Sequence, residues 1–142
     1  MGSEDYTISS DPDRLDRDWI HEAISTDTYW ATGRSREDMD RAIEHSLPYG
    51  LYDGTGRQLA FARLVTDQTY FAWLSDVYVD RSARGKGVGK LLMRHLVEET
   101  EKMNLRRVML ATSDAQGLYG QFDFTEIDDD YAWMYRVRPG RD

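Results

Sequence analysis

One glycine-rich stretch limits the folds open to this chain more than any other segment. It reads Arg84-Gly85-Lys86-Gly87-Val88-Gly89 and separates two segments of different hydrophobic period. Residues 70–79 before it are aromatic and β-branched, as in a strand, whereas apolar residues recur at helical spacing over residues 88–96. The start of a helix offers free backbone N–H groups, and glycines let an anion approach the backbone closely. The stretch therefore predicts a phosphate-binding turn between a strand and a helix.

Two common phosphate-binding motifs do not match this stretch. The nucleoside-triphosphate loop needs Gly-x-x-x-x-Gly-Lys-Ser/Thr, but Leu91 follows Gly89-Lys90, and Arg84 stands at the position of the first glycine. The dinucleotide motif needs a third glycine where Lys90 stands, and it normally follows the first strand of a parallel sheet. The sequence therefore indicates a different phosphate-bearing ligand.

The charge distribution supports an anion site in the same region. The chain holds 26 acidic and 18 basic residues, and its net charge of −8 disfavours nucleic acid as a partner. Residues 81–97 nevertheless contain five basic residues and no acidic one, so the rest of the chain has 13 basic and 26 acidic residues. A charge run is usually a solvated helix face. Because this one surrounds the glycines, we favour a site for a small polyanion.

Length and composition indicate one domain over residues 1–142, with residues 1–5 flexible. No run approaches the roughly 20 apolar residues of a membrane span, so no membrane partner is expected. The absence of cysteine excludes disulfides, thiolate metal sites and a cysteine nucleophile, and it makes the cytoplasm the expected compartment. The histidines and carboxylates show no metal-ligand spacing, so we expect no metal.

The order of the expected elements indicates a mixed α/β sheet. A short strand at residues 6–9 precedes two amphipathic helices, which we expect to begin near Pro12 and Ser35. The period then changes to strands at 49–53, 59–66 and 70–79, a helix from Val88 to Asn104, a strand at 108–111, a short helix at 115–122 and a final strand at 131–137. Three successive strands joined by tight turns favour a partly antiparallel sheet with helices on its faces.

The glycine-rich stretch and its flanks resemble a known family. Arg84 to Gly89 fit the pattern Arg/Gln-x-x-Gly-x-Gly/Ala, and the strand residues 76–79 with Arg81-Ser82-Ala83 precede it. Downstream, Leu118-Tyr119-Gly120-Gln121-Phe122-Asp123-Phe124 is similar to a Leu-Tyr-x-x-x-Gly-Phe segment. Together they resemble the acetyl-coenzyme A loop and adjacent helix of the GCN5-related N-acetyltransferases (GNAT), over roughly residues 50–126. This resemblance implies an α/β fold of the α+β type, with a mixed, mainly antiparallel sheet of six to seven strands flanked by about four helices.

The resemblance implies acetyl-coenzyme A as co-substrate, held by the strand end, the glycine-rich stretch and one later residue. These are Val77, Tyr78, Val79, Arg84, Gly85, Lys86, Gly87, Val88, Gly89, Lys90 and Thr112. Thr112 stands where many members have an asparagine that contacts the pantetheine arm. Asp123 stands where they usually have glycine, and aspartate tolerates the left-handed backbone better than most residues.

Two residues are candidates for the chemistry. The resemblance assigns Tyr119 the role of proton donor to the departing thiolate, although a tyrosine at helical spacing from Phe122 is by itself more often a core residue. Asp76 interrupts an apolar strand. It either forms a hydrogen bond at the strand end or faces the substrate cleft, as a base or as an anchor for the amine. A backbone N–H of residues 77–79 would serve the developing oxyanion.

The acceptor side is predicted from the family's use of the first two helices and their loop. Candidates there are Tyr29, Trp30, Arg34, Ser46 and, from the strand at 70–79, Trp73. Tyr29 and Trp30 either surround a cation or fill the core. Arg34 could bind a carboxylate, which suggests an amino-acid-like acceptor.

We therefore predict an N-acetyltransferase that moves an acetyl group directly from acetyl-coenzyme A to the amine of a small molecule. Acetylation of a protein or peptide amine is the alternative within enzymes. A non-catalytic acyl-coenzyme A sensor is the alternative from another class, but such a module has no need of Tyr119. Neither nucleic acid nor a membrane is an expected partner. A homodimer is a candidate oligomeric state that the sequence does not decide.

Overall fold

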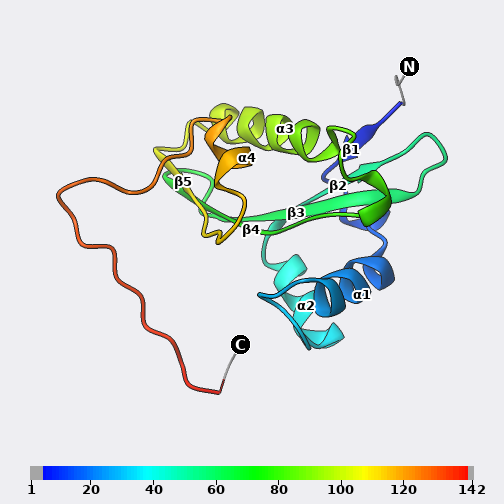
Figure 1. Cartoon of the computed structure of the whole chain (residues 1–142), viewed down its shortest axis with the longest axis horizontal. Helices are drawn as coiled ribbons and strands as arrows, with labels where there is room; N and C mark the ends of the chain where they lie inside the picture. The colour runs from blue at the N-terminus through cyan, green and yellow to red at the C-terminus, as the bar shows by residue number, and fades with distance from the viewer. Residues whose placement is uncertain (1–4, 141–142) are drawn as a thin grey trace.

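The computed structural model describes residues 5–140, which form one mixed sheet with helices on both faces (Figure 1). Apart from Asp5, the expected flexible segment 1–5 lies outside the described residues. The strands are β1 (Thr7–Ser9), β2 (Leu47–Tyr52), β3 (Gln58–Thr66), β4 (Phe71–Val79) and β5 (Arg107–Met109). The helices are α1 (Arg17–Asp27), α2 (Arg36–Glu44), α3 (Val88–Lys102) and α4 (Gln116–Gly120), with 3-10 turns η1 (Pro12–Arg14) and η2 (Arg81–Ala83).

The sheet follows the chain, with strand order β1-β2-β3-β4-β5. β1 to β4 pair antiparallel, and β5 pairs parallel to β4. The β2–β3 hairpin closes at Asp53, whose carboxylate accepts the backbone N–H groups of Thr55 (2.9 Å) and Arg57 (3.1 Å). This is the side-chain-to-backbone bonding typical of an aspartate turn. The predicted fold class, a mainly antiparallel α/β sheet with four helices among the described residues, is confirmed.

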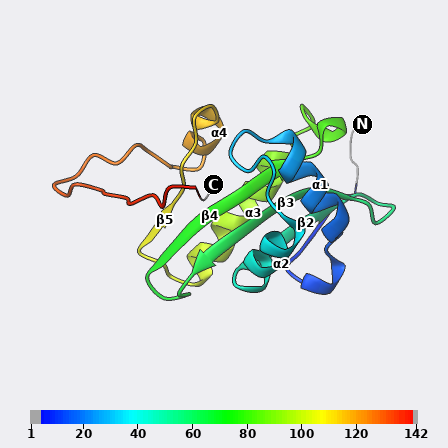
Figure 2. The same cartoon turned by 90° about the horizontal axis from the view of Figure 1, so that it is seen from below.

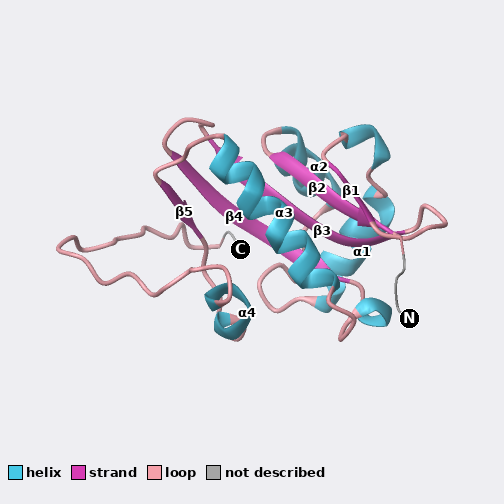
Figure 3. Cartoon of the chain, turned by 90° about the horizontal axis from the view of Figure 1, so that it is seen from above, coloured by secondary structure: helices cyan, strands magenta, loops and turns pink. Residues whose placement is uncertain are grey.

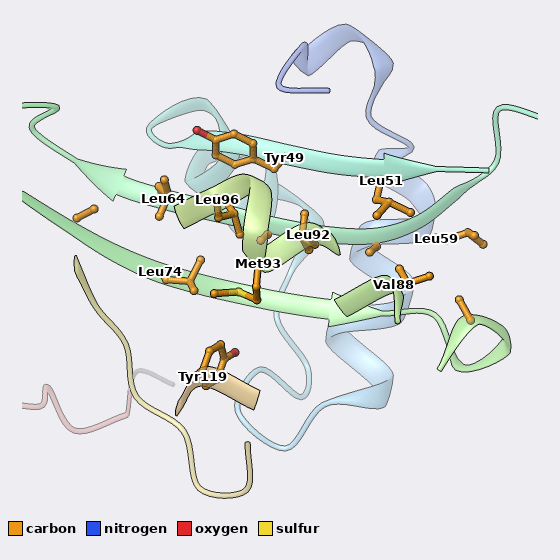
Figure 4. Close-up of a cluster of buried hydrophobic side chains, with 14 residues drawn as sticks. Tyr49, Leu51, Leu59, Leu64, Leu74, Val88, Leu92, Met93, Leu96 and Tyr119 are labelled. Carbon is orange, nitrogen blue, oxygen red and sulfur yellow. The ribbon is translucent and has the colours of Figure 1, made fainter. Parts of the chain in front are cut away.

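The two faces of the sheet are covered by different helices. α3 lies across one face (Figure 3), and α1 and α2 lie against the opposite face (Figure 2). Under α3, a core forms around Tyr49, Leu64 and Leu92 (Figure 4). A second core joins α1 and α2 to Phe61 on the other face. Replacing a fully buried leucine such as Leu92 by alanine typically costs about 2–5 kcal/mol of stability.

A β-bulge in β4 changes which face its side chains point to. The register with β3 shifts between Phe61 and Arg63, opposite Asp76, whose backbone is left-handed with φ of 56°. Before the bulge, Leu74 belongs to the core under α3, whereas Tyr78 after the bulge belongs to the core under α1 and α2. An extra residue in one strand produces this change, because side chains otherwise alternate with period two. The bulge therefore directs Asp76 toward the α1–α2 side.

The prediction of a final strand at residues 131–137 is wrong, and the sheet has five strands rather than six to seven. After α4 the chain runs away from the sheet as an extended loop (Figure 1). Tyr131, Met134 and Tyr135 are 75, 90 and 89 % exposed. A segment with strand composition forms no strand without a partner ladder. Residues 131–137 pair with no strand of the described chain, although the Trp133 ring lies 4.7 Å from the guanidinium carbon of Arg107 in β5.

Among residues 5–140, no helix is both long enough and apolar enough to cross a membrane.

Candidate active site

The turn before α3 presents unpaired backbone N–H groups. Gly85 and Gly87 adopt left-handed φ angles of 81° and 79°, and Gly87 caps the helix without a side chain. Within residues 5–140, the N–H groups of residues 85–90 donate no intramolecular hydrogen bond, and the first α3 bond runs from Leu91 N–H to the Gly87 carbonyl. A Cβ at either glycine would meet nothing within 4 Å, so the space beside the turn is open. These donors and the helix dipole fit a phosphate group.

One carboxylate at the end of α1 ties this turn to the rest of the protein. Asp27 forms ion pairs with Arg81 and Arg84 (3.4 Å to the latter) and accepts a hydrogen bond from the Tyr78 hydroxyl at 2.6 Å. Hydrogen bonds from Arg81 and Tyr78 hold the pKa of Asp27 far below its usual range. Burial and the Asp27 carboxylate raise the pKa of Tyr78 to about 12. Two predicted cofactor residues, Tyr78 and Arg84, therefore direct their side chains toward Asp27.

The sequence pattern did not identify Asp27 as a functional residue, because Asp27 stands at the end of a helical pattern and belongs to no local motif. Arg84 also donates from Nε to the carbonyl of Val79 at 3.0 Å. This bond joins the glycine turn to the end of β4, so both predicted cofactor elements meet at one place.

The edge of β4 that faces β5 is open over most of its length. β5 pairs with β4 only over Phe71–Trp73, and β4 from Leu74 onward has β3 as its strand partner on the other side. The backbone of residues 77–79 on the open side therefore offers N–H and C=O groups next to the glycine turn. Such groups can bind an extended arm as an added strand would, and an N–H there can donate to an oxyanion.

Tyr119 lies in α4 and belongs to the same core cluster as Met93 of α3 (Figure 4). Its side chain is 9 % exposed, and its ring contacts Phe124 edge-to-face at 5.9 Å. Among the described residues, the buried side-chain oxygen without a partner belongs to Tyr52, so solvent reaches the Tyr119 hydroxyl. Burial, followed by the Asp114 carboxylate and the Tyr29 hydroxyl, raises the pKa of Tyr119. The hydroxyl therefore stays protonated at neutral pH and can donate a proton.

The loop before α4 is held by short polar bonds. Thr112 Oγ1 accepts the N–H of Ala115 at 3.0 Å. Ser113 donates from its hydroxyl to the Tyr29 hydroxyl at 2.6 Å, which joins this loop to the α1–α2 loop. Thr112 thus shapes the approach to α4, and Tyr29 bridges two loops beside Tyr119.

An ion cluster lies on the α1–α2 side of the bulge. Asp76 is 5 % exposed, and its Oδ2 accepts from Arg63 Nε at 2.6 Å and from Arg34 Nη1 at 2.8 Å. Arg63 also donates to the Ser46 hydroxyl at 3.3 Å. Burial alone raises the pKa of Asp76, but the guanidinium groups of Arg63 and then Arg34 outweigh it and hold the pKa below its usual range. The carboxylate is therefore charged at neutral pH.

The structure places the five predicted acceptor residues at three positions. Arg34 and Ser46 meet around Asp76, and Trp73 lies on β4, where it pairs with Val65. Tyr29 and Trp30 form an edge-to-face pair at 5.2 Å on the α1–α2 loop, near the α4 loop rather than at the ion cluster.

Arg63 is the member of the ion cluster that the sequence analysis did not single out. It is a lone charge within the apolar strand Gln58–Thr66, and that interruption was the available signal. Among residues 5–140, no group of three or more histidine, cysteine, aspartate or glutamate side chains is arranged to hold a metal ion.

A splayed pair of strands beside a phosphate-binding helix turn, with a protonated tyrosine next to the gap, defines an acyl-transfer fold. A family model described as the Acetyltransferase (GNAT) family matches residues 14–124. The chain therefore belongs to the GNAT family, and it is an acetyltransferase. The family uses acetyl-coenzyme A as co-substrate, which agrees with the open donors at the glycine turn.

Relatives from bacteria, fungi and plants agree with this assignment. A crystal structure of a GNAT-family protein from Xanthomonas campestris pv. campestris is 41 % identical, covers 96 % of this chain and 95 % of its own, and has a TM-score of 0.89. A Gibberella zeae protein named as an acetyltransferase is 33 % identical over 87 % of this chain and 83 % of its own. The chloroplastic serotonin N-acetyltransferase 2 of Oryza sativa subsp. japonica is 33 % identical over 74 % of this chain and 56 % of its own.

Proposed function

We propose that this chain transfers the acetyl group of acetyl-coenzyme A directly to the amine of a small molecule. The observation that carries the proposal is the meeting of three features: the free N–H groups of residues 85–90, the open edge of β4 and the protonated hydroxyl of Tyr119. The first binds phosphate, the second binds an extended arm, and the third donates a proton. No one of them alone defines the reaction.

The cofactor residues divide by the part of acetyl-coenzyme A that they would hold. The N–H groups of Gly85, Lys86, Gly87, Val88, Gly89 and Lys90 would bind the pyrophosphate, and the backbone of Val77, Tyr78 and Val79 would bind the pantetheine arm. Arg84 would act mainly by fixing the turn, because its side chain pairs with Asp27 and with the Val79 carbonyl. Thr112 would position the α4 loop through its bond to Ala115.

Two proton movements accompany the transfer. When bound, the thioester supplies the acetyl group, and a thiolate leaves. Tyr119, which its raised pKa keeps protonated at neutral pH, would donate its hydroxyl proton to that thiolate and then regain a proton from solvent. A free alkylamine has a pKa of about 10.4 and must lose a proton before it can attack. Asp76, the candidate for this step, has a lowered pKa and two arginine partners. Asp76 is therefore a poor base and would instead hold the acceptor side in place, and the amine's proton would pass to bulk solvent.

A small acceptor is favoured over a peptide by the loops beside Tyr119. The bond between Tyr29 and Ser113 joins the α1–α2 loop to the α4 loop, which narrows the approach from that side. The rice relative named above is a serotonin N-acetyltransferase, which acts on a small amine. We therefore place small amines ahead of protein termini and lysines.

The test is release of coenzyme A thiol from acetyl-coenzyme A in the presence of small amines and of short peptides. The chain has no cysteine, so a thiol reagent reports only the product. We expect thiol release with one or more small amines and little with peptides. Faster release with peptides would favour the protein-acetylating alternative, and binding of acetyl-coenzyme A without release for any amine would favour a sensor module.

We also propose a homodimer formed through the segment after α4. Met134 and Tyr135 are almost fully exposed and Tyr131 is largely exposed, and β5 ends the sheet with one edge unpaired. Exposed apolar side chains and an open strand edge are the features that a second copy of the chain can cover. A cavity of about 730 Å³ is lined by β5, α4, residues 122–129 and Trp133 of the chain's own segment, and a side chain of the second copy would enter it.

Light scattering after size-exclusion chromatography tests the dimer. We expect a dimeric mass for the full chain and a monomeric mass for the Met134→Glu/Tyr135→Asp variant. A monomer at every concentration of the unchanged protein would contradict the proposal. The cytoplasmic location and the absence of nucleic acid as a partner remain predictions.

A further inference from the structure

The ion cluster of Arg34, Arg63 and Asp76 has more positive than negative charge. Both arginines bind the same oxygen of one aspartate, so two guanidinium charges face a single carboxylate. A fully compensated buried pair would need one charge of each sign. The cluster therefore carries one excess positive charge.

The arginines also have donors to spare. A guanidinium group has five N–H groups in a planar fork. Arg34 gives a bond to Asp76 and a weak contact to the Met39 sulfur at 3.6 Å, and Arg63 gives one bond each to Asp76 and Ser46. Their side chains are 20 % and 13 % exposed, so part of each group reaches solvent. Such a fork is the geometry that binds carboxylates and phosphates in pairs of bonds.

The cluster is fixed in place from three sides. Arg63 comes from the middle of β3, and Asp76 comes from the bulge of β4. Arg34 comes from the α1–α2 loop, and its backbone carbonyl accepts a hydrogen bond from His21 Nε2 of α1 at 2.8 Å. The left-handed backbone of Asp76, with φ of 56°, is uncommon for a residue other than glycine, and such residues often lie at functional sites. The two arginines are thus held before any ligand arrives.

The position of the cluster relates it to acetyl transfer. Asp76 immediately precedes residues 77–79, whose open backbone edge is proposed above to hold the reacting end of the co-substrate. An acceptor bound between the α1–α2 loop and β4 would therefore have one end at the arginines and the other at that edge.

We propose that Arg34 and Arg63 bind an anionic group of the acceptor, so that the substrate is an amine carrying a carboxylate. This inference rests on the proposed acetyl transfer and names its substrate class. Asp76 is then a positioning residue, which holds the two guanidinium groups in register and prevents them from repelling each other. The carboxylate is bound, and the amine remains free to react.

Matched pairs of amines provide the first test. We would measure thiol release with L-tyrosine and tyramine, and with L-tryptophan and tryptamine, because each pair differs by one carboxylate. O-phosphoethanolamine and ethanolamine form a third pair, which separates a phosphate preference from a carboxylate preference. We expect a KM about 10-fold or more lower for the carboxylated member of a pair, as for the loss of a charge-assisted hydrogen bond. Equal KM values, or preference for the amine without an anion, would overturn the inference. A preference confined to the phosphorylated pair would overturn the carboxylate assignment.

Substitution of one arginine provides the second test. Arg34→Gln should raise the KM for the carboxylated amine about 10-fold and leave the KM for its partner without a carboxylate unchanged, whereas Arg34→Lys should recover only part of the loss because it lacks the fork. Arg41→Gln is the matched control, because Arg41 is 62 % exposed on α2 and pairs with Glu37. If Arg34→Gln changes both KM values equally, the arginine is merely structural and the inference fails.

A binding measurement separates this inference from the proposed transfer. The probes are the N-acetylated amino acids N-acetyl-L-tyrosine and N-acetyl-L-tryptophan, with N-acetyltyramine as the uncharged comparison. We expect a rise in Tm with the carboxylated probes that is lost in Arg34→Gln and kept in Arg41→Gln. If thiol release fails for all amines while this rise is present, the anion site stands and the proposed transfer does not. If the rise is absent although amines are acetylated, the anion site is wrong and the transfer stands.

Discussion

The cofactor side and the acceptor side of this protein are made from different parts of the chain. On the cofactor side, six consecutive residues supply backbone N–H groups, and their geometry follows from glycines at two left-handed positions. On the acceptor side, Arg34, Ser46, Arg63 and Asp76 come from four separate segments and act through side chains. A site made from backbone is conserved in form across a family, whereas a site made from side chains can change with the substrate. The cofactor side therefore identifies the reaction, and the acceptor side identifies the acceptor.

The largest expected effect, on co-substrate binding, comes from placing a branched side chain at the glycine turn. Gly87→Val should abolish the rise in Tm that acetyl-coenzyme A produces in the unchanged protein, because a β-branched residue is strained at φ of 79° and would block the N–H groups. Gly56→Val is the control, since Gly56 is also left-handed, at 90°, but lies in the β2–β3 turn. A normal acetyl-coenzyme A shift in Gly87→Val would show that the turn does not hold the co-substrate.

The proton donor should affect turnover without affecting binding. Tyr119→Phe should lower kcat about 100-fold, within the usual contribution of a general acid, and leave the acetyl-coenzyme A dissociation constant nearly unchanged. The control is Tyr49→Phe, because Tyr49 is a buried tyrosine of the same core and burial raises its pKa to about 12. Equal losses of turnover and binding in Tyr119→Phe would indicate a tyrosine that only packs.

The link between the cofactor side and α1 should have a moderate effect. Asp27→Asn removes the charge that holds Arg81 and Arg84, so the KM for acetyl-coenzyme A should rise roughly 2- to 5-fold, as expected for a partly exposed ion pair. Steady-state kinetics at two salt concentrations would measure this KM. Asp18→Asn is the control, because Asp18 lies on the exposed side of α1 and pairs with Arg36. An unchanged KM would mean that the turn keeps its shape without α1.

The smallest expected effect is that of a substitution on the acceptor side, measured as the pH dependence of stability. The pKa of Asp76 in the folded protein lies below its unfolded value of about 3.8, so its contribution is fully present above that value and is lost as the pH falls through the folded pKa. Asp76→Asn should therefore flatten the fall in the free energy of unfolding, and with it the fall in Tm, below about pH 4. The free-energy change is on the order of 1 kcal/mol for each pKa unit. Circular dichroism melts from pH 6 to pH 2.5 would measure this, and an unchanged acid limb would show that Asp76 is not paired in the folded state.

The same division explains what the sequence could predict. Local chemistry was sufficient for the glycine turn, for the turn at Asp53 and for the cap of α2, where Ser35 accepts the N–H of Asp38 at 3.1 Å. It was also sufficient for the order of elements up to α4. In each case the interacting groups lie within a few residues of one another.

Features that depend on distant contacts were missed. The bulge at Asp76 exists only because β3 and β4 pair out of step, and Arg63 meets Arg34 only after the α1–α2 loop folds over the sheet. Residues 131–137 have the composition of a strand but form no ladder with β5, and strand composition cannot show whether a ladder forms. Side-chain sites and strand pairing are therefore the parts that required the structure.

The most direct test of the central claim follows the acetyl group itself. The protein is incubated with acetyl-coenzyme A labelled with carbon-13 in the acetyl carbonyl and with the amine that gives the fastest thiol release, and the products are examined by NMR. The account predicts one labelled amide for each thiol released, with no labelled intermediate on the protein. Thiol release without a labelled amide, or no release with any amine or peptide, would contradict it.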